Sequence, residues 1–240
     1  MTTSDLRIEL IDSASDFEQG FDALRNAFGT QMHDGIWDAL YPSWDTPAGR
    51  AQGVARLIKR WETCNPAFTT HLKATLPDPD KPGSRRIVGM AIWCQFSAVE
   101  GQGEPPQEGV PADFAAYFPG DEAGARYISQ LLNSMKKRRF EAIRKKAGAQ
   151  PSAVIVLDIC AVDPAFQRRG AASALVQWGL DEAKRRGGLE AMTEGSLMGR
   201  LAYVKLGFRS MGEIEYEVDE EFAARNRPSN LFMRTGTDPK

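Results

Sequence analysis

One short segment has the residue types of a phosphate-binding loop. Residues 167–173 read Gln-Arg-Arg-Gly-Ala-Ala-Ser and lie between an apolar run and a predicted helix. Small residues let a ligand approach the backbone closely, and the free N–H groups and dipole of a helix N-terminus attract anions. The segment predicts a pyrophosphate site, with close packing as the alternative, formed by Arg168, Arg169, Gly170, Ala171, Ala172 and Ser173.

A single carboxylate interrupts the apolar run that precedes this loop. Asp158 is the one charged residue in the stretch 153–162. Burying an isolated carboxylate is costly unless it is paired or faces a polar cavity. Asp158 could therefore bind a substrate ammonium or relay its proton with an upward-shifted pKa. The alternative is a buried ion pair with an arginine.

The composition limits the possible partners of this chain. Its 240 residues are 42% hydrophobic and 26% charged, and 30 basic side chains nearly balance 32 acidic ones. This balance argues against nucleic-acid binding through a basic surface. No apolar run approaches a membrane span, and the first residues carry no signal core. We therefore expect a cytoplasmic protein, with the nucleus still open, that binds no membrane.

The sequence offers no pattern typical of a metal site. Its three cysteines, Cys64, Cys94 and Cys160, are widely spaced, and its two histidines are His33 and His71. No Cys/His ligand spacing or disulfide framework follows from them. A reducing compartment fits this cysteine usage best.

Strands and helices alternate along the chain. Periodicity and turn residues predict helices at about 17–28, 48–62, 121–147, 170–186 and 198–206. Strands are predicted at about 6–11, 69–75, 86–96, 152–162, 189–193, 208–218 and 230–234. Trp37, Tyr41 and Trp44 fall in a stretch with two prolines, which we expect to be a loop. This order predicts an α/β or α+β fold with a mixed sheet.

The helix at 121–147 ends in a basic run. Residues 136–146 read Lys-Lys-Arg-Arg-Phe-Glu-Ala-Ile-Arg-Lys-Lys. We interpret this run as a solvated helix face, and a lid or a patch for an acidic partner is the alternative.

Two motifs, and their places in the order of strands and helices, resemble those of the GNAT (GCN5-related) N-acetyltransferase superfamily. Gln167-Arg-Arg-Gly-Ala-Ala172 resembles the family's Gln/Arg-x-x-Gly-x-Gly/Ala signature and follows a strand, as it does in the family. Residues 203–208, Tyr-Val-Lys-Leu-Gly-Phe, resemble the segment that ends the family core. The spacing of Ser196, Gly199 and Tyr203 is most similar to small fungal members.

The resemblance implies a fold and a domain organisation. The expected fold is a central mixed, splayed sheet of six to seven strands with helices on both faces. The likeness is strong over about 154–218 and rests only on element order before residue 150. We expect one domain over 1–240, with an insertion at about 97–150 that forms part of the acceptor site.

The resemblance also implies acetyl-CoA as the cofactor. By position, backbone groups of Cys160, Ala161 and Val162 would pair with the pantetheine arm, and the N–H groups of Arg168 through Ser173 would hold the pyrophosphate. Ala171 and Ala172 replace glycines that are common in the family, and Ser196 stands where many relatives have Asn. These departures leave binding possible because the contacts are mostly main chain.

Catalytic roles follow from the same resemblance. Backbone N–H near Val162 would stabilise the oxyanion, and Tyr203 would donate a proton to the leaving CoA thiolate. Tyr203 as a plain core residue is the alternative. Asp158 occupies a position where arylalkylamine acetyltransferases carry a catalytic histidine, and Glu194 is a second candidate base. Four aromatic residues are candidates for an acceptor pocket or for the core: Trp37, Tyr41, Trp93 and Phe96.

The expected activity is acetyl transfer to a primary amine, most simply of a small molecule, by direct attack in a ternary complex. Cys160 lacks a neighbouring base in the sequence, which disfavours an acetyl-cysteine route. The alternatives are a protein lysine or N-terminal acetyltransferase and a non-catalytic acetyl-CoA-binding module. We expect a monomer or a homodimer.

Overall fold

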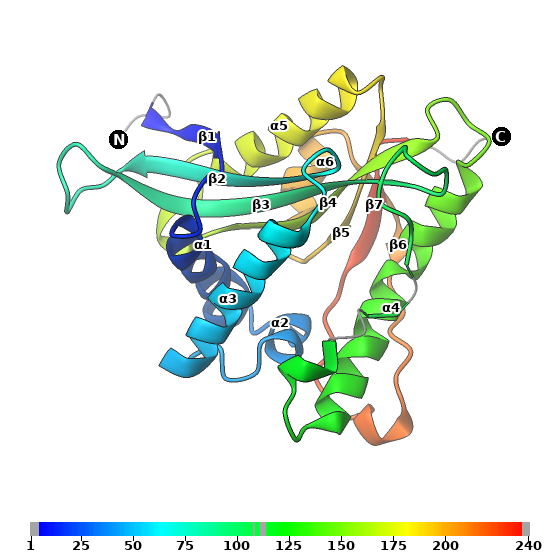
Figure 1. The fold of residues 1–240 in the computed structure, drawn as a ribbon, viewed down its shortest axis with the longest axis horizontal. Coiled ribbons are helices and arrows are strands. Elements are labelled where there is room, and N and C mark those ends of the chain that lie inside the picture. The colour runs from blue at the N-terminus through cyan, green and yellow to red at the C-terminus, as the bar shows by residue number, and fades with distance from the viewer. Residues whose placement is uncertain (1–4, 108, 111–113, 237–240) are drawn as a thin grey trace.

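The computed structural model describes residues 5–107, 109–110 and 114–236. Its seven strands form one sheet in the order β1-β2-β3-β4-β5-β7-β6, and helices cover both faces (Figure 1). The predicted mixed sheet between helical layers is confirmed. Positions 1–4 of the N-terminal segment, and 108, 111–113 of the predicted insertion, lie outside the described residues.

The order of elements agrees with the predicted alternation. The strands are β1 (Arg7–Leu10), β2 (Thr69–Pro77), β3 (Arg85–Ser97), β4 (Ala153–Val162), β5 (Glu190–Gly195), β6 (Arg209–Glu213) and β7 (Leu231–Arg234). The helices are α1 (Asp16–Leu24), α2 (Gly35–Leu40), α3 (Pro47–Thr63), α4 (Glu122–Lys145), α5 (Ala171–Arg185) and α6 (Arg200–Lys205). A π-helical turn, Arg25–Gln31, continues α1, and a 3₁₀ turn, Phe114–Tyr117, precedes α4.

The sheet opens between β4 and β5. These two strands are parallel and pair only over Val154–Leu157 and Glu190–Thr193. Beyond Leu157, β4 continues to Val162 bonded to β3 alone. The register of β3 and β4 shifts there, with Ile92 opposite Ile159 but Trp93 opposite Leu157. Asp158 is therefore the extra residue of a β-bulge, which bends the strand where it leaves β5.

Different helices cover the two faces of the sheet. One face is covered by α5 and α6, whose Leu175, Val176 and Tyr203 share a core with Leu157. On the other face α1–α3 pack over β3, while α4 packs over β4 and β5 near Val154 and Met192. In Figure 1, α3 and α4 lie on either side of the sheet's centre, and α2 packs against the core under α4.

Two predicted segments differ from the structure. The loop predicted around Trp37 contains α2, because Asp34 caps it by accepting hydrogen bonds from the N–H groups of Ile36 and Trp37. The strand predicted to run to Val218 ends at Glu213, because Ile214 and Tyr216 turn inward and pack in the core under α4.

The solvated-face interpretation of the basic run is wrong for part of it. Arg139 is among the most buried side chains of the described residues, at 1% exposure. Lys137, one residue away from Lys136, is exposed and pairs with Glu217. The helix therefore turns one cationic side inward and the other outward, as its 3.6-residue period requires.

Within the part of the chain that the structure describes, no helix combines the length and hydrophobicity of a membrane span.

Close packing of α5 on β3 depends on one glycine. A Cβ at Gly179 would lie 2.0 Å from the Trp93 ring, whose Nε1 donates to the Leu175 carbonyl at 3.2 Å. We predict that Gly179→Ala lowers the free energy of unfolding by about 1–3 kcal/mol, because the ring must move in a packed core. Urea denaturation measures this. Trp93→Leu in the same background should restore part of the loss, and an unchanged midpoint for Gly179→Ala would contradict the prediction.

Candidate active site

A cavity of about 680 Å³ passes through the opening between β4 and β5. Its lining includes four consecutive residues of β4, Leu157 to Cys160, and both Thr193 and Glu194 of β5. Consecutive strand residues point to opposite faces, so the cavity reaches both sides of the sheet. From the α6 side it is lined by Ser196 and Tyr203, and from the other side by α2, α3 and α4. The free edge of β4 is therefore accessible from within the molecule.

The predicted phosphate loop lies at the carboxyl end of β4. Gly170 begins α5 in the left-handed conformation (φ 86°), and a Cβ there would meet nothing within 4 Å. The first intrahelical bond is that from Ala174 N–H to the Gly170 carbonyl. The preceding N–H groups, including Ala171, Ala172 and Ser173, are those that helix geometry leaves without an intrahelical acceptor. Arg168, Arg169 and Ser173 are exposed beside them.

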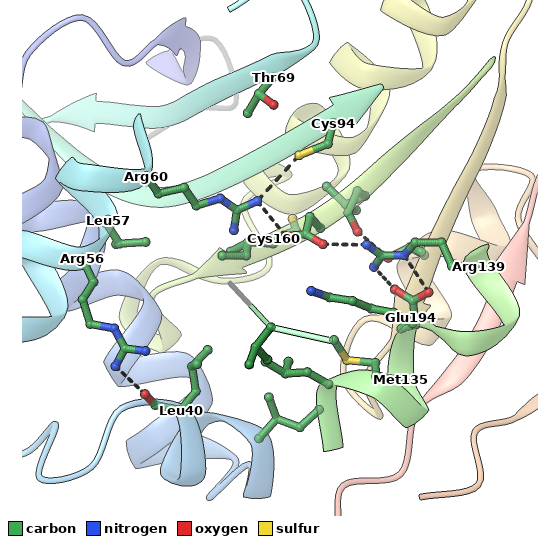
Figure 2. Close-up of a pocket in the computed structure, with 18 of the residues that line it drawn as sticks. Leu40, Arg56, Leu57, Arg60, Thr69, Cys94, Met135, Arg139, Cys160 and Glu194 are labelled. Atoms are coloured by element: carbon green, nitrogen blue, oxygen red, sulfur yellow. Dashed lines mark hydrogen bonds and ion pairs between the residues drawn. The ribbon is translucent and has the colours of Figure 1, made fainter. Parts of the chain in front are cut away.

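Asp158 lies at the centre of an ion network. One of its carboxylate oxygens accepts from Arg60 Nη2 of α3 and the other from Arg139 Nη1 of α4, each at 2.8 Å. Arg139 also pairs with Glu194 of β5, its Nε lying 3.0 Å from Oε1. Figure 2 shows Arg60 and Arg139 reaching toward one another from opposite walls, with Cys160 between them. The network ties together four of the elements that border the cavity, α3, α4, β4 and β5.

The environment of Asp158 overturns one expectation. Burial alone would raise its pKa, but the guanidiniums of Arg60 and Arg139 outweigh burial and hold the pKa well below its ordinary range. The upward-shifted pKa that the sequence suggested is therefore wrong. The side chain is 16% exposed and still lines the cavity. Asp158 is thus both ion-paired and accessible to a ligand as a permanent anion.

Tyr203 of α6 also lines the cavity. Tyr203 packs on Phe208 with 5.8 Å between ring centroids, and it lines the cavity together with Cys160 and Ser196. Burial, with a contribution from Cys160, raises the pKa of Tyr203, so its phenol stays protonated. Burial raises the pKa of Cys160 to about 12. Ser196 Oγ accepts from the N–H of Gly199 at 3.3 Å and so shapes the turn into α6.

Three of the four candidate aromatic residues line the cavity. Trp37, Tyr41 and Phe96 belong to its wall, whereas Trp93 packs against α5 on the other face of the sheet. Trp37 and Tyr41 are 4.5 Å apart between ring centroids and belong to the core under α3 as well. Trp37 and Tyr41 are therefore both core residues and part of the pocket wall.

Comparison with known proteins agrees with this geometry. Residues 108–208 match the family described as Acetyltransferase (GNAT) family. The matched part of the chain is a GNAT acetyltransferase domain. The matched region spans α4, β4, α5, β5 and α6, and so contains the split of the sheet and the α5 N-terminus.

Solved structures of GNAT acetyltransferases share the fold over nearly the whole chain. Drosophila melanogaster polyamine N-acetyltransferase, which forms N-acetylagmatine, has a TM-score of 0.59 at 15% identity, covering 96% of this chain and 98% of its own. Arylalkylamine N-acetyltransferase 2 from Aedes aegypti has a TM-score of 0.58 at 18% identity, covering 96% and 98%. A histone acetyltransferase and related acetyltransferase from Corynebacterium glutamicum has a TM-score of 0.56 at 18% identity, covering 98% and 99%. No curated protein matches the sequence.

Sequence reasoning missed the cationic wall of this cavity. Arg56 and Arg60 belong to α3, and Lys136 and Arg139 belong to α4, where the basic run suggested a solvent-facing helix. One signal was available: Arg56 and Arg60, like Lys136 and Arg139, are spaced at one helical turn and share a face. Which face turns inward depends on tertiary packing that periodicity in a strongly polar helix does not reveal.

Proposed function

We propose that the chain transfers an acetyl group from acetyl-CoA to a primary amine of a small molecule. The cavity through the β4–β5 opening carries this proposal, because it connects the free edge of β4 with Tyr203 on one side and Asp158 on the other. The GNAT assignment supplies the reaction class. The cavity is walled by α3 on one side and α4 on the other, which favours a small acceptor over a folded protein surface. The insertion at 97–150 would then supply one wall of the acceptor site.

The residues present fit acetyl-CoA. The main chain of Cys160, Ala161 and Val162 has no strand partner on the β5 side and can bond to the pantetheine arm. The N–H groups from Arg168 to Ser173, at the start of a 15-residue helix, can hold the pyrophosphate. Ser196 lines the cavity and would border the bound arm. When bound, acetyl-CoA supplies the activated acetyl group.

Different groups of the chain have the remaining roles in the reaction. Asp158 attracts the substrate ammonium as a fixed anion, and the proton leaves through water in the cavity, because a carboxyl with so low a pKa does not retain it. The free N–H groups of β4 near Val162 stabilise negative charge on the acetyl oxygen. Tyr203 holds the proton that the departing thiolate needs, at its phenol oxygen.

Direct attack is favoured over a covalent enzyme intermediate. The Cys160 thiol, with a pKa of about 12, is protonated at neutral pH and is a weak nucleophile. No histidine is among the residues that line the cavity. The amine therefore has to be the nucleophile, which requires both substrates to be bound together.

Gly170 allows a direct test of the cofactor site. We predict that Gly170→Glu weakens CoA binding at least about tenfold, because a carboxylate would lie where the pyrophosphate binds, and titration calorimetry measures the affinity. Gly83→Glu is a matched control, since Gly83 has the same left-handed φ (85° against 86°) and equally open surroundings, but lies in the β2–β3 turn. A folded Gly170→Glu protein with unchanged CoA affinity would remove the loop from the site.

A further inference from the structure

The charged groups that line the cavity differ in how well they are neutralised. Arg60 and Arg139 each pair with carboxylates, Asp158 and Glu194. Asp34 accepts from the N–H groups at the start of α2. Other charged groups of the wall include Glu104 and the cations Arg56 and Lys136. Arg56 is the most informative of them because its geometry is fixed.

Aromatic rings hold the guanidinium of Arg56 in place. Its Cζ lies 4.7 Å from the ring centroid of Tyr41 and 4.2 Å from that of Tyr117. Nη1 donates to the Leu40 carbonyl at 2.6 Å, and Figure 2 shows this bond. Rings and carbonyl together restrain the plane of the group. Such a fork is pre-organised for two hydrogen bonds to one oxyanion.

Arg56 has no acidic partner in the described part of the chain. No carboxylate there bonds to it, and its Nε and Nη2 make no hydrogen bond to those residues. Burial lowers its pKa, the direction expected when a cation is desolvated without an anion beside it. A partly buried charge left without an opposite charge is costly, and a ligand that supplies the anion removes that cost.

We propose that the acceptor amine carries an oxyanion, a carboxylate or a phosphate, that binds Arg56. This inference rests on the proposed acetyl transfer and specifies its substrate class. Arg56 lies one helical turn before Arg60, which bonds to Asp158, so the anion site is roughly 6 Å along α3 from the network. The ammonium turns toward Asp158 and the anion toward Arg56. The cavity wall also carries aromatic and aliphatic side chains, including Trp37, Leu57 and Phe114, which suit an apolar linker.

Matched amines test the inference through turnover. The pairs are hexylamine with 6-aminohexanoate and phenethylamine with phenylalanine, and 3-aminopropylphosphonate represents the phosphate class. We expect the wild-type protein to acetylate the anionic members with the higher kcat/KM, and the phosphonate to separate phosphate from carboxylate specificity. A preference for the neutral members would overturn the proposal and leave acetyl transfer itself intact.

Variants assign the preference to Arg56. Arg56→Met should lower kcat/KM for the anionic amines by about 30-fold, the effect of losing hydrogen bonds to a charged group. Values for the neutral amines should stay nearly constant, and Arg56→Lys should recover part of the loss. Lys184→Met, at an exposed lysine of α5, controls for the change in net charge. Equal losses for neutral and anionic amines would mean that Arg56 only holds α2 and α3 together.

A binding assay decides the inference even without turnover. With CoA present, N-acetyl-6-aminohexanoate should raise the melting temperature of the wild-type protein more than N-hexylacetamide does, and Arg56→Met should abolish the difference. If no amine is acetylated but this difference is found, the proposed function fails and the anion site stands. If the two products stabilise the protein equally, the anion site is refuted.

Discussion

Replacing Tyr203 by phenylalanine should lower kcat by roughly 10²-fold, the usual size of a general-acid contribution. The ring lies against Phe208, and the substitution keeps that packing while removing the phenol oxygen. Its raised pKa means that Tyr203 remains a proton donor throughout the neutral range. The loss should appear in kcat with little change in the KM for acetyl-CoA, because the proton is needed only as the thiolate departs.

The measurement needs conditions in which chemistry limits turnover. Single-turnover rates of CoA release, detected with a thiol reagent, provide them once an acceptor is known. Tyr127→Phe is a suitable control, because Tyr127 donates to the Asn226 carbonyl from α4, away from the cavity lining. A Tyr203→Phe protein with the wild-type single-turnover rate would reduce Tyr203 to a core residue.

Much of the fold was predictable because its strands and helices have clear periods. The run 153–162 was recognisable as a central strand because it is apolar on both faces, and it pairs on both sides over its first half. The start of α5 was recognisable because glycine and small residues follow that strand. Both features depend on local sequence, and both border the site.

The chemistry of Asp158 was less accessible from the sequence. Its partners lie 98 and 19 positions away in the chain, in α3 and α4. The sequence identified an isolated charge that needed compensation, but not whether an arginine or a substrate supplied it. Arg139 was assigned to solvent because six other basic residues surround it in 136–146. Burial of one cation in such a run is decided by the approach of two other elements, which no local pattern records.

Removal of the Asp158 charge should therefore affect stability first. In Asp158→Asn, Arg60 loses its carboxylate partner and Arg139 keeps only Glu194, so we expect the free energy of unfolding to fall by about 3 kcal/mol. Urea denaturation at neutral pH measures the loss. Asp181→Asn, at an exposed carboxylate of α5, is the matched control and should change stability little.

The pH dependence of this loss has a definite sign. The native pKa of Asp158 is depressed below its unfolded value near 3.9, so the native state binds fewer protons than the unfolded state between the two values. The contribution of the carboxylate is complete above the unfolded pKa and disappears as pH falls toward the native one. The stability difference between the wild-type protein and Asp158→Asn should be constant from about pH 6 to 8 and narrow below about pH 4.

Kinetic measurements on Asp158→Asn distinguish two roles of Asp158, a fixed anion that binds the ammonium and a general base. If Asp158 attracts the ammonium as a fixed charge, Asp158→Asn raises the KM for the amine while the acidic limb of the kcat/KM profile keeps its midpoint, because that limb belongs to another group. A double-mutant cycle with Arg60→Met should give a coupling energy of at least about 1 kcal/mol, since the two side chains bond directly. Disappearance of the acidic limb in Asp158→Asn, with stability unchanged, would instead make Asp158 the general base and contradict the ion-pair interpretation.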